Sequence, residues 1–268
     1  ILLRSDGTAV YITQDIGTAI ERYHDFQFNR MIYTVADEQD YHFQVLFLVL
    51  KKLGYTWAEN CYHLSYGMVT LPSGKMKSRE GTVVDADDLL DQMEQTAATI
   101  AKDRGKEKTG ENLHTIVGMG ALKFQLLKVD PRKSIRFDPD ESIDFHGKTG
   151  PFIQYTYARI QSLLRKYSSE TVFSTAPYLF NNQERVLIKK CLDYQSQLLT
   201  SSTNKSPALL ANYLYDLVKT YNTYYQETPI LQAKEPDTTQ FRVALSAHIA
   251  KIIKKTTYLL GFEVPEKM

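Results

Sequence analysis

The chain has 268 residues, of which 43% are hydrophobic and 24% are charged, and its formal net charge is +1. This length and apolar content suffice for one large domain or two ordinary ones, and the low net charge restricts any nucleic-acid partner to local basic patches. The two cysteines, Cys61 and Cys191, exclude a Cys-rich zinc site and a disulfide framework, which favours a reducing, cytoplasmic setting. The sequence shows no signal-peptide pattern and no apolar run long enough to span a bilayer, so we expect no membrane partner.

The N-terminal third shows three stretches with a strand pattern. Residues 2–13 alternate in polarity around an Asp-Gly pair at positions 6 and 7, which predicts a hairpin. Residues 30–37 and residues 62–71 are apolar runs typical of buried strands.

Two helices are predicted between these strands. The first covers residues 13–26 and is expected to begin near Thr13 or Asp15. The second covers residues 37–54, with Asp37 as its N-cap and Gly54 at its end. The side chains that we expect on its apolar face are Tyr41, Val45, Leu48 and Leu53. The alternation of strands and helices predicts a parallel α/β sheet.

The pattern is helical from about Ala86 onward. Residues 102–112 are expected to form a solvated loop, and residues 128–150, which contain prolines and glycines, an irregular linker. Beyond them only amphipathic helices are predicted, one of which has Ser206 as N-cap and Pro207 in its first turn. Its expected core-facing side chains are Leu210, Leu214, Leu217, Tyr221 and Tyr224. The sequence therefore predicts part of an α/β domain followed by an all-α bundle.

A basic stretch, GKMKSREGT, covers residues 74–82. Its alternating cations, Lys75, Lys77 and Arg79, are flanked by glycines, a composition typical of loops that bind phosphate. The spacing matches neither the Walker loop nor the dinucleotide fingerprint. A solvated charged turn is the alternative interpretation.

Polar side chains follow the predicted strands. Tyr11 and Asp15 lie across the first junction between strand and helix, and their phenol and carboxylate suit a cationic ligand such as a guanidinium. Gln39 and His42 share a face in the first turn of the second helix. In an open α/β sheet these positions lie at the carboxyl ends of strands, where ligands bind. The alternatives are that Asp15 is a helix cap and that Gln39 and His42 are surface residues.

The helix expected after residue 149 has two faces. One is apolar and consists of Ile153, Tyr157, Ile160, Leu164 and Tyr167. The other contains Phe152, Tyr155 and Arg159, which are groups that stack on splayed RNA bases. A helix packed on both sides explains the same pattern.

Four stretches together resemble the arginyl-tRNA synthetase family of class I aminoacyl-tRNA synthetases. They are LLRSDGTAVYITQDIGTA, ADEQDYHFQVL, SYGMVTLPSGKMKSREGTVVDADDL and GKTGPFIQYTYARIQSLLRK. The resemblance covers essentially the whole chain, as the C-terminal half of that enzyme. It implies the second half of a Rossmann-like catalytic domain plus a helical-bundle anticodon-binding domain. The implied division is 1–90 for the catalytic part, 91–147 for a helical stem-contact or connecting region, and 148–268 for the anticodon-binding domain.

The resemblance also implies roles for individual residues. Residues 75–79, KMKSR, resemble the family's K-M-S-K-S loop, although the second lysine of that loop falls at Ser78 and Lys77 stands one place earlier. The implied catalytic residues are Lys75, Lys77, Ser78 and Arg79. The implied arginine-binding residues are Tyr11, Asp15 and Gln39, and the implied ATP-binding residues are His42, Gly67, Met68, Val69, Lys75 and Met76. The implied anticodon-binding residues are Phe152, Tyr155, Arg159, Tyr225 and Met268.

The implied activity is the formation of arginyl-adenylate from L-arginine and ATP, with Mg²⁺ accompanying ATP, and the transfer of arginine to tRNA(Arg) in the cytoplasm. No tightly bound metal is expected. The chain contains no H-I-G-H motif, which belongs upstream of Ile1, so we interpret the chain as a piece of a longer protein and expect it to be inactive alone. A non-catalytic tRNA-binding module is an alternative. A cysteinyl synthetase is another, but two isolated cysteines do not make its zinc site.

Overall fold

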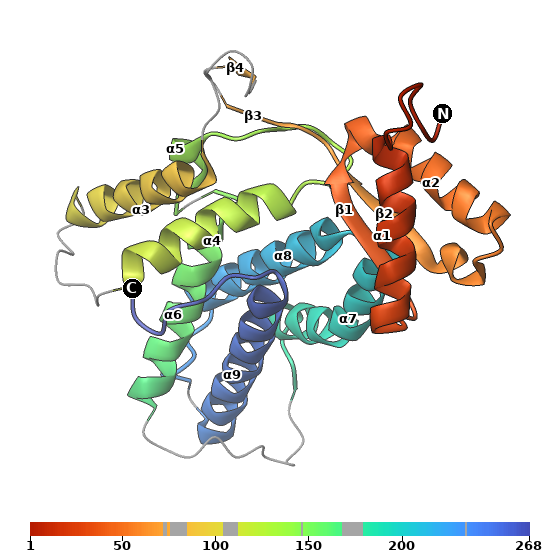
Figure 1. Ribbon diagram of the computed structural model, residues 1–268. Coiled ribbons are helices and arrows are strands. Elements are labelled where there is room, and N and C mark those ends of the chain that lie inside the picture. Colours follow the sequence, from red (N-terminus) through yellow and green to blue (C-terminus); the bar gives the residue numbers. More distant parts are fainter. Residues whose placement is uncertain (72–73, 76–84, 104–111, 146, 168–178, 234) are drawn as a thin grey trace. The chain divides into compact units, whose positions relative to one another are not determined.

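The computed structural model describes residues 1–71, 74–75, 85–103, 112–145, 147–167, 179–233 and 235–268 (Figure 1). The chain divides into two compact units. The first comprises residues 1–68 and 131–134, and the second comprises residues 69–130 and 135–268. Each is described by itself.

The first unit is built on two parallel strands, β1 (Met31–Ala36) and β2 (Cys61–Tyr66). Their register pairs Met31 with Cys61 at one end and Ala36 with Tyr66 at the other. The helices of this unit are α1 (Tyr11–Phe26) and α2 (Asp40–Lys52), with short 3₁₀ turns η1 (Asp37–Gln39) and η2 (Thr56–Asn60). The predicted parallel arrangement of the two strands is therefore confirmed.

The core of the first unit corrects the apolar face predicted for α2. Tyr41, Leu48 and Leu53 are exposed, whereas Phe43, Leu46 and Leu50 are buried. These three pack with Ala19 of α1, Trp57 and Ala58 of η2, and partly buried Tyr33 and Val35 of β1. Nearly every residue from Tyr41 to Leu50 is apolar, so the position of the strands, and not the periodicity, selects the buried face.

The helix starts also differ from the prediction. Helix α1 begins at Tyr11 after an extended Val10, so Tyr11 belongs to the helix and Asp15 lies in its second turn. Asp37 opens η1 and does not cap α2, which begins at Asp40. The end of α2 is as predicted, because Gly54 has a positive φ of 90°.

The predicted N-terminal hairpin is present as a short turn. Leu3 and Ala9 form an antiparallel bridge, and Gly7 between them has a φ of 80°. The Thr8 N–H donates to the Asp6 carboxylate at 2.9 Å, as expected of an Asp-Gly turn. The strand predicted over 62–71 is in fact two strands, because it is broken at Gly67 and Met68.

The second unit begins with the small strands β3 (Val69–Leu71), β4 (Gly74–Lys75) and β5 (Ile135–Arg136). Strand β3 pairs antiparallel with β4 and parallel with β5. Between β4 and β5 lie the helices α3 (Ala86–Asp103) and α4 (Leu113–Leu127), and α5 (Pro139–Ser142) follows β5. Their shared core contains Met93, Ala121, Phe137 and Ile143. The first two residues of the loop predicted at 102–112 belong to α3, which extends to Asp103, and residues 104–111 lie outside the described residues.

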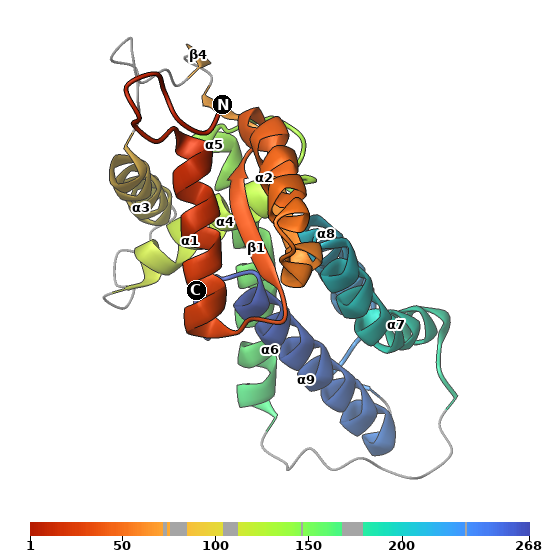
Figure 2. The ribbon, with the colours of Figure 1, turned by 45° about the vertical axis from the view of Figure 1, so that its right-hand side comes forward.

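The remaining helices form the predicted bundle. They are α6 (Gly150–Lys166), α7 (Asn182–Asn204), α8 (Pro207–Glu227) and α9 (Pro236–Leu259), and Figure 2 shows α6, α8 and α9 side by side. The described residues beyond 150 contain no strand. The apolar stripe predicted for α8 is confirmed, because its five members, Leu210, Leu214, Leu217, Tyr221 and Tyr224, are all buried. Helix α6 starts at a glycine for a steric reason, since a Cβ on Gly150 would collide with the Gly120 carbonyl of α4.

Candidate functional site

The carboxyl ends of β1 and β2 define the candidate site of the first unit. Ala36 and Tyr66 are register partners, so the two strands end side by side. After Ala36 the chain enters η1 and the first turn of α2, which carry Gln39 and His42. After Tyr66 it continues into Gly67 and Met68. Four of the predicted site residues therefore follow strand ends at one edge of the sheet, where open α/β sheets bind ligands.

Asp15 joins this edge through His42. The His42 Nε2 atom lies 2.6 Å from the Asp15 Oδ2 atom, across 27 residues of sequence. Both side chains are partly exposed, at 46% for Asp15 and 24% for His42, so solvent and a ligand reach the pair. Asp15 does not cap α1, because Val10 occupies the N-cap position. The helix-cap alternative for Asp15 is thus wrong, and the pair links a predicted arginine-binding residue to a predicted ATP-binding residue.

Tyr11 and Gln39 are the exposed residues of the three that are predicted to bind arginine. The Tyr11 side chain is 80% exposed in the first turn of α1, one turn before Asp15 and on the same face. Gln39 is exposed at the end of η1. Tyr11 lies on α1, which carries Asp15, and Gln39 occupies the N-cap position of α2, which carries His42.

His63 and Asp40, which contact each other near this edge, were not among the predicted site residues. The His63 ring on β2 places Nε2 at 2.9 Å from the Val35 carbonyl oxygen and Nδ1 at 3.2 Å from the Asp40 carboxylate. The ring also packs on Phe43, with centroids 4.4 Å apart. His63 therefore ties the end of β1 to the start of α2, on either side of Gln39. A lone histidine in a strand gave no pattern from which this bridge could be inferred.

Gly67 has a structural reason to be glycine. Its N–H donates to the Pro131 carbonyl at 2.7 Å, and a Cβ would lie 2.6 Å from the Lys133 carbonyl carbon. The backbone of residues 131–134 thus passes too close for any side chain at position 67. Met68, the next residue, is exposed.

The other predicted ATP-site and loop residues are in the second unit or outside the described residues. Val69 opens β3, pairs with Ile135 and packs against the cluster around Met93. Lys75 lies in β4 with its backbone opposite Thr70. Met76, Lys77, Ser78 and Arg79 lie outside the described residues.

The second unit brings together three of the predicted anticodon-binding residues, Tyr155, Arg159 and Tyr225. The Arg159 guanidinium carbon lies 4.8 Å from the Tyr155 ring centroid and 5.0 Å from that of Tyr225. Both rings thus interact with the cation, an arrangement that fixes the guanidinium and gives each ring an electrostatic partner. Phe152 lies one turn before Tyr155, and its ring packs at 5.8 Å from Tyr215 of α8. This face of α6 is partly exposed and polar at its centre.

Met268 is not part of this cluster. Its side chain packs against the hydrophobic cluster of α3 and α4 that contains Met93, while Phe152 and Tyr225 pack against the bundle core. Beside Tyr225 the structure instead has a hollow of about 230 Å³, whose walls include Ser162, Lys166 and Thr228. No local sequence pattern indicates this hollow, because its walls come from α6 and from the segment after α8, which are far apart in the chain.

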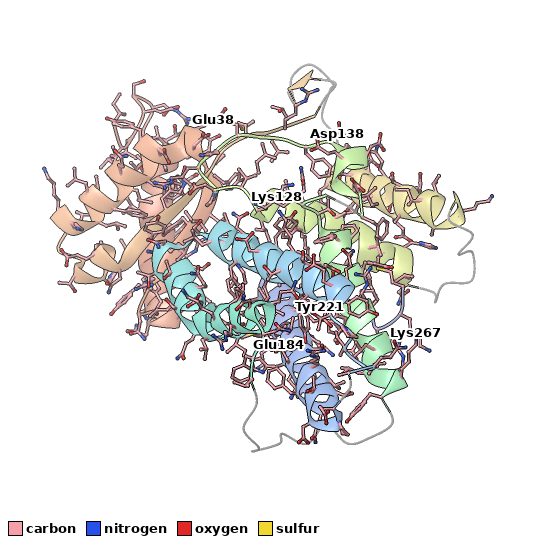
Figure 3. The ribbon with its side chains drawn as sticks, turned by 180° about the vertical axis from the view of Figure 1, so that it is seen from behind. Glu38, Lys128, Asp138, Glu184, Tyr221 and Lys267 are labelled. Carbon is pink, nitrogen blue, oxygen red and sulfur yellow. The ribbon has the colours of Figure 1, made fainter. Side chains whose placement is uncertain are left out.

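The second unit contains a fully buried carboxylate, and burial also shifts the pKa of side chains such as Lys128 and Tyr221. Glu184, Lys128 and Tyr221 are labelled in Figure 3. The fully buried Glu184 carboxylate accepts from Arg242 Nε at 2.9 Å and from the Asn181 N–H at 2.9 Å. Burial lowers the pKa of Lys128, whose Nζ donates to the Lys148 carbonyl at 2.8 Å, and raises the pKa of Tyr221.

None of the described helices combines the length with the apolar character that a membrane span requires. The described residues contain no group of three or more His, Cys, Asp or Glu side chains arranged to hold a metal ion.

Two family models match this chain. Residues 1–138 match the family model described as "tRNA synthetases class I (R), catalytic domain", and residues 153–268 match "DALR anticodon binding domain". The predicted fold class, a class I catalytic domain followed by a helical anticodon-binding domain, is thereby confirmed. The class defined by the fold and its strand-end site is that of class I aminoacyl-tRNA synthetases.

The relatives specify the family. The chain is 56% identical to the arginine–tRNA ligase of Flavobacterium psychrophilum and 52% identical to that of Parabacteroides distasonis. Each match covers 100% of this chain, but only 45% and 46% of the respective relative. The solved Thermus thermophilus arginyl-tRNA synthetase matches the whole chain with a TM-score of 0.88 and 28% identity, over 50% of its own length. The chain belongs to the arginyl-tRNA synthetase family, and the cysteinyl alternative is wrong.

Proposed function

We propose that the longer protein to which this sequence belongs is an arginine–tRNA ligase of class I. The observation that carries the proposal is the Asp15–His42 pair at the strand ends, in a chain whose relatives are arginine–tRNA ligases over its entire length. A carboxylate beside a phenol suits the guanidinium of L-arginine. The same relatives favour this function over a non-catalytic tRNA-binding module.

The proposed reaction has two steps. A carboxylate oxygen of arginine attacks the α-phosphorus of ATP, and the bond to the β-phosphate breaks with release of pyrophosphate. A terminal hydroxyl of tRNA(Arg) then attacks the adenylate carbonyl, and AMP leaves. No protein nucleophile takes part, so catalysis is positioning and electrostatic stabilisation.

The geometry of the first unit supports the roles that we propose for its residues. Asp15 accepts from the guanidinium of the substrate, with Tyr11 and Gln39 on the exposed surface beside it. His42 holds the Asp15 carboxylate from the other side and is the proposed contact to the adenosine. Gly67 lets the backbone pass closely, and Met68 is a proposed neighbour of the adenine, as is Val69, the first residue of the second unit.

The basic loop is proposed to close over the phosphates. Lys75, Lys77, Ser78 and Arg79 would supply donors and positive charge to the pyrophosphate as it leaves, with Met76 against the nucleotide. Mg²⁺ is proposed to accompany ATP as part of the substrate, because the polyphosphate itself is a ligand for Mg²⁺.

The helical part is proposed to bind the anticodon loop of tRNA(Arg). The half-exposed cluster of Tyr155, Arg159 and Tyr225, with Phe152 beside it, offers rings and a cation to unstacked bases. Met268 is a proposed contact from a separate position. We retain the division into 1–90, 91–147 and 148–268, and we propose a cytoplasmic location on the basis of the two unpaired cysteines.

The experiment that tests the arginine site is Asp15→Asn in the longer protein. Loss of a charged hydrogen-bond partner for the guanidinium should raise the KM for arginine by a factor equivalent to roughly 2–5 kcal/mol, and the KM for ATP far less. Asp25→Asn, at the exposed end of the same helix, is the matched control and should change neither. Equal increases in the two KM values for Asp15→Asn would show that Asp15 acts only by holding His42, and the proposed arginine site would be wrong.

A further inference from the structure

The amide of Asn222, on α8, lies directly behind the Arg159 cluster. Its side chain is buried, with 8% of the residue exposed, and Arg159 donates from Nη1 to Asn222 Oδ1 at 2.5 Å. We propose that Asn222 is a positioning residue that fixes the Arg159 guanidinium for hydrogen bonding to acceptor atoms of bound RNA. This inference rests on the proposed tRNA-binding function of the helical part.

The hydrogen bonds around Asn222 allow its amide only one orientation. Asn222 Nδ2 donates to Thr156 Oγ1 at 2.7 Å and to the Val218 carbonyl at 3.1 Å. The Thr156 hydroxyl proton is already donated to the Phe152 carbonyl at 2.8 Å, so Thr156 Oγ1 can only accept from Asn222. A flipped amide would turn its oxygen toward two acceptors. The carbonyl oxygen of Asn222 must therefore face Arg159.

This fixed acceptor completes a three-sided clamp on the guanidinium. Tyr155 and Tyr225 interact with it through their rings, at 4.8 and 5.0 Å, and Asn222 holds one of its nitrogen atoms. An arginine side chain has about five N–H donors in a planar fork, and within the described residues the bond to Asn222 is the hydrogen bond that the guanidinium makes. The other N–H groups are thus held in a defined plane and are available to a ligand.

The clamp also defines the chemistry of that ligand. The rings of Tyr155 and Tyr225 already contact the guanidinium. The cluster therefore offers a ligand the remaining N–H groups of Arg159 as hydrogen-bond donors, in addition to rings for stacking. A planar donor fork suits paired acceptors, which RNA offers on base edges and on phosphate oxygens. Arg159 would lose this defined plane without Asn222, because the side chain has many rotamers.

A double-mutant cycle in the longer protein tests the proposal. The variants are Asn222→Leu, Arg159→Leu and the pair, with binding of the cognate tRNA and thermal melting measured for each. Asn212→Leu is the matched control: Asn212 lies on the same helix and donates its amide to the Lys128 carbonyl, 3.1 Å away, with no link to Arg159. The salt dependence of tRNA binding is measured for Arg159→Leu as well.

If Asn222 acts through Arg159, Asn222→Leu weakens tRNA binding about 10-fold, and the pair is no weaker than Arg159→Leu alone within about twofold. Asn212→Leu then changes tRNA affinity less than about twofold. A salt slope lowered by about one unit in Arg159→Leu indicates a phosphate acceptor, and an unchanged slope indicates a base edge.

Two results would overturn the inference. In one, the effects of Asn222→Leu and Arg159→Leu simply add. In the other, Asn222→Leu lowers the melting temperature like Asn212→Leu but leaves the affinity of the folded fraction unchanged. If Arg159→Leu binds tRNA normally, the proposal that this face binds tRNA is itself wrong, and this outcome can be told apart from the two above.

Discussion

Replacing Tyr155 by alanine separates an RNA-binding face from a second packed face on α6. Tyr155 is 36% exposed, whereas Tyr157, two residues along the same helix, is 3% exposed in the bundle core. The two tyrosines therefore form a matched pair with the same chemistry on opposite sides of one helix. The sequence alone left both roles open for Tyr155.

The expected effects follow from these exposures. Full burial of a large apolar side chain contributes roughly 1.5–3 kcal/mol, and about two-thirds of that applies to Tyr155. Loss of its interaction with Arg159 adds roughly 0.5–1 kcal/mol, so Tyr155→Ala should lower the free energy of unfolding by roughly 1.5–3 kcal/mol. Tyr157→Ala leaves a core cavity and should cost roughly 3–5 kcal/mol.

Binding should follow the opposite order. Tyr155→Ala removes a ring that stacks on a base and orients Arg159, so tRNA affinity should fall by roughly 1–3 kcal/mol, or about 5- to 150-fold. Tyr157→Ala should leave the affinity of the folded fraction nearly unchanged.

Denaturant unfolding and tRNA binding on the two variants are the measurements. The reasoning is refuted if Tyr155→Ala destabilises as much as Tyr157→Ala and its folded fraction binds tRNA normally. That result would mean that Tyr155 is a core residue despite its exposure.

Three further changes have defined outcomes. Glu184→Gln should lower the free energy of unfolding by roughly 3–5 kcal/mol, because it leaves the largely buried Arg242 without its carboxylate. Glu59→Gln, in the exposed pair with Lys51, should cost less than about 1 kcal/mol, and similar losses for the two variants in denaturant unfolding would contradict this reasoning. Burial raises the pKa of Cys61 and Cys191 from 9.0 to about 11, so the two thiols stay protonated to a higher pH in the folded protein than in the unfolded chain. The free energy of unfolding should therefore fall as the pH rises from about 9 to about 11. The double variant Cys61→Ala, Cys191→Ala should show a shallower fall, and an identical slope would argue against this cause. Lys75→Ala and Lys77→Ala in the longer protein should lower kcat for adenylate formation and leave arginine affinity nearly unchanged, as pre-steady-state rates would show; a change confined to the KM for arginine would count against phosphate binding.

The sequence by itself determined the elements whose pattern is local. The α8 stripe from Leu210 to Tyr224 has one apolar face, and all of its predicted members are buried. Gly54 ends α2 as predicted because a positive φ favours glycine wherever the helix lies. The family resemblance likewise rests on contiguous stretches of residues, which can be compared with a known family without any knowledge of the fold.

The tertiary structure decided which side chains meet. Helix α2 is apolar on most sides, so only its packing on β1 and α1 shows that Phe43, Leu46 and Leu50 form the core. Asp15 and His42 are 27 residues apart, and Arg159 and Asn222 are 63 apart. Hydrogen bonds of this kind depend on the relative placement of whole helices, which is set by the summed burial of many side chains. No local pattern encodes such a placement, and for that reason the clamp on Arg159 could be found only in the folded chain.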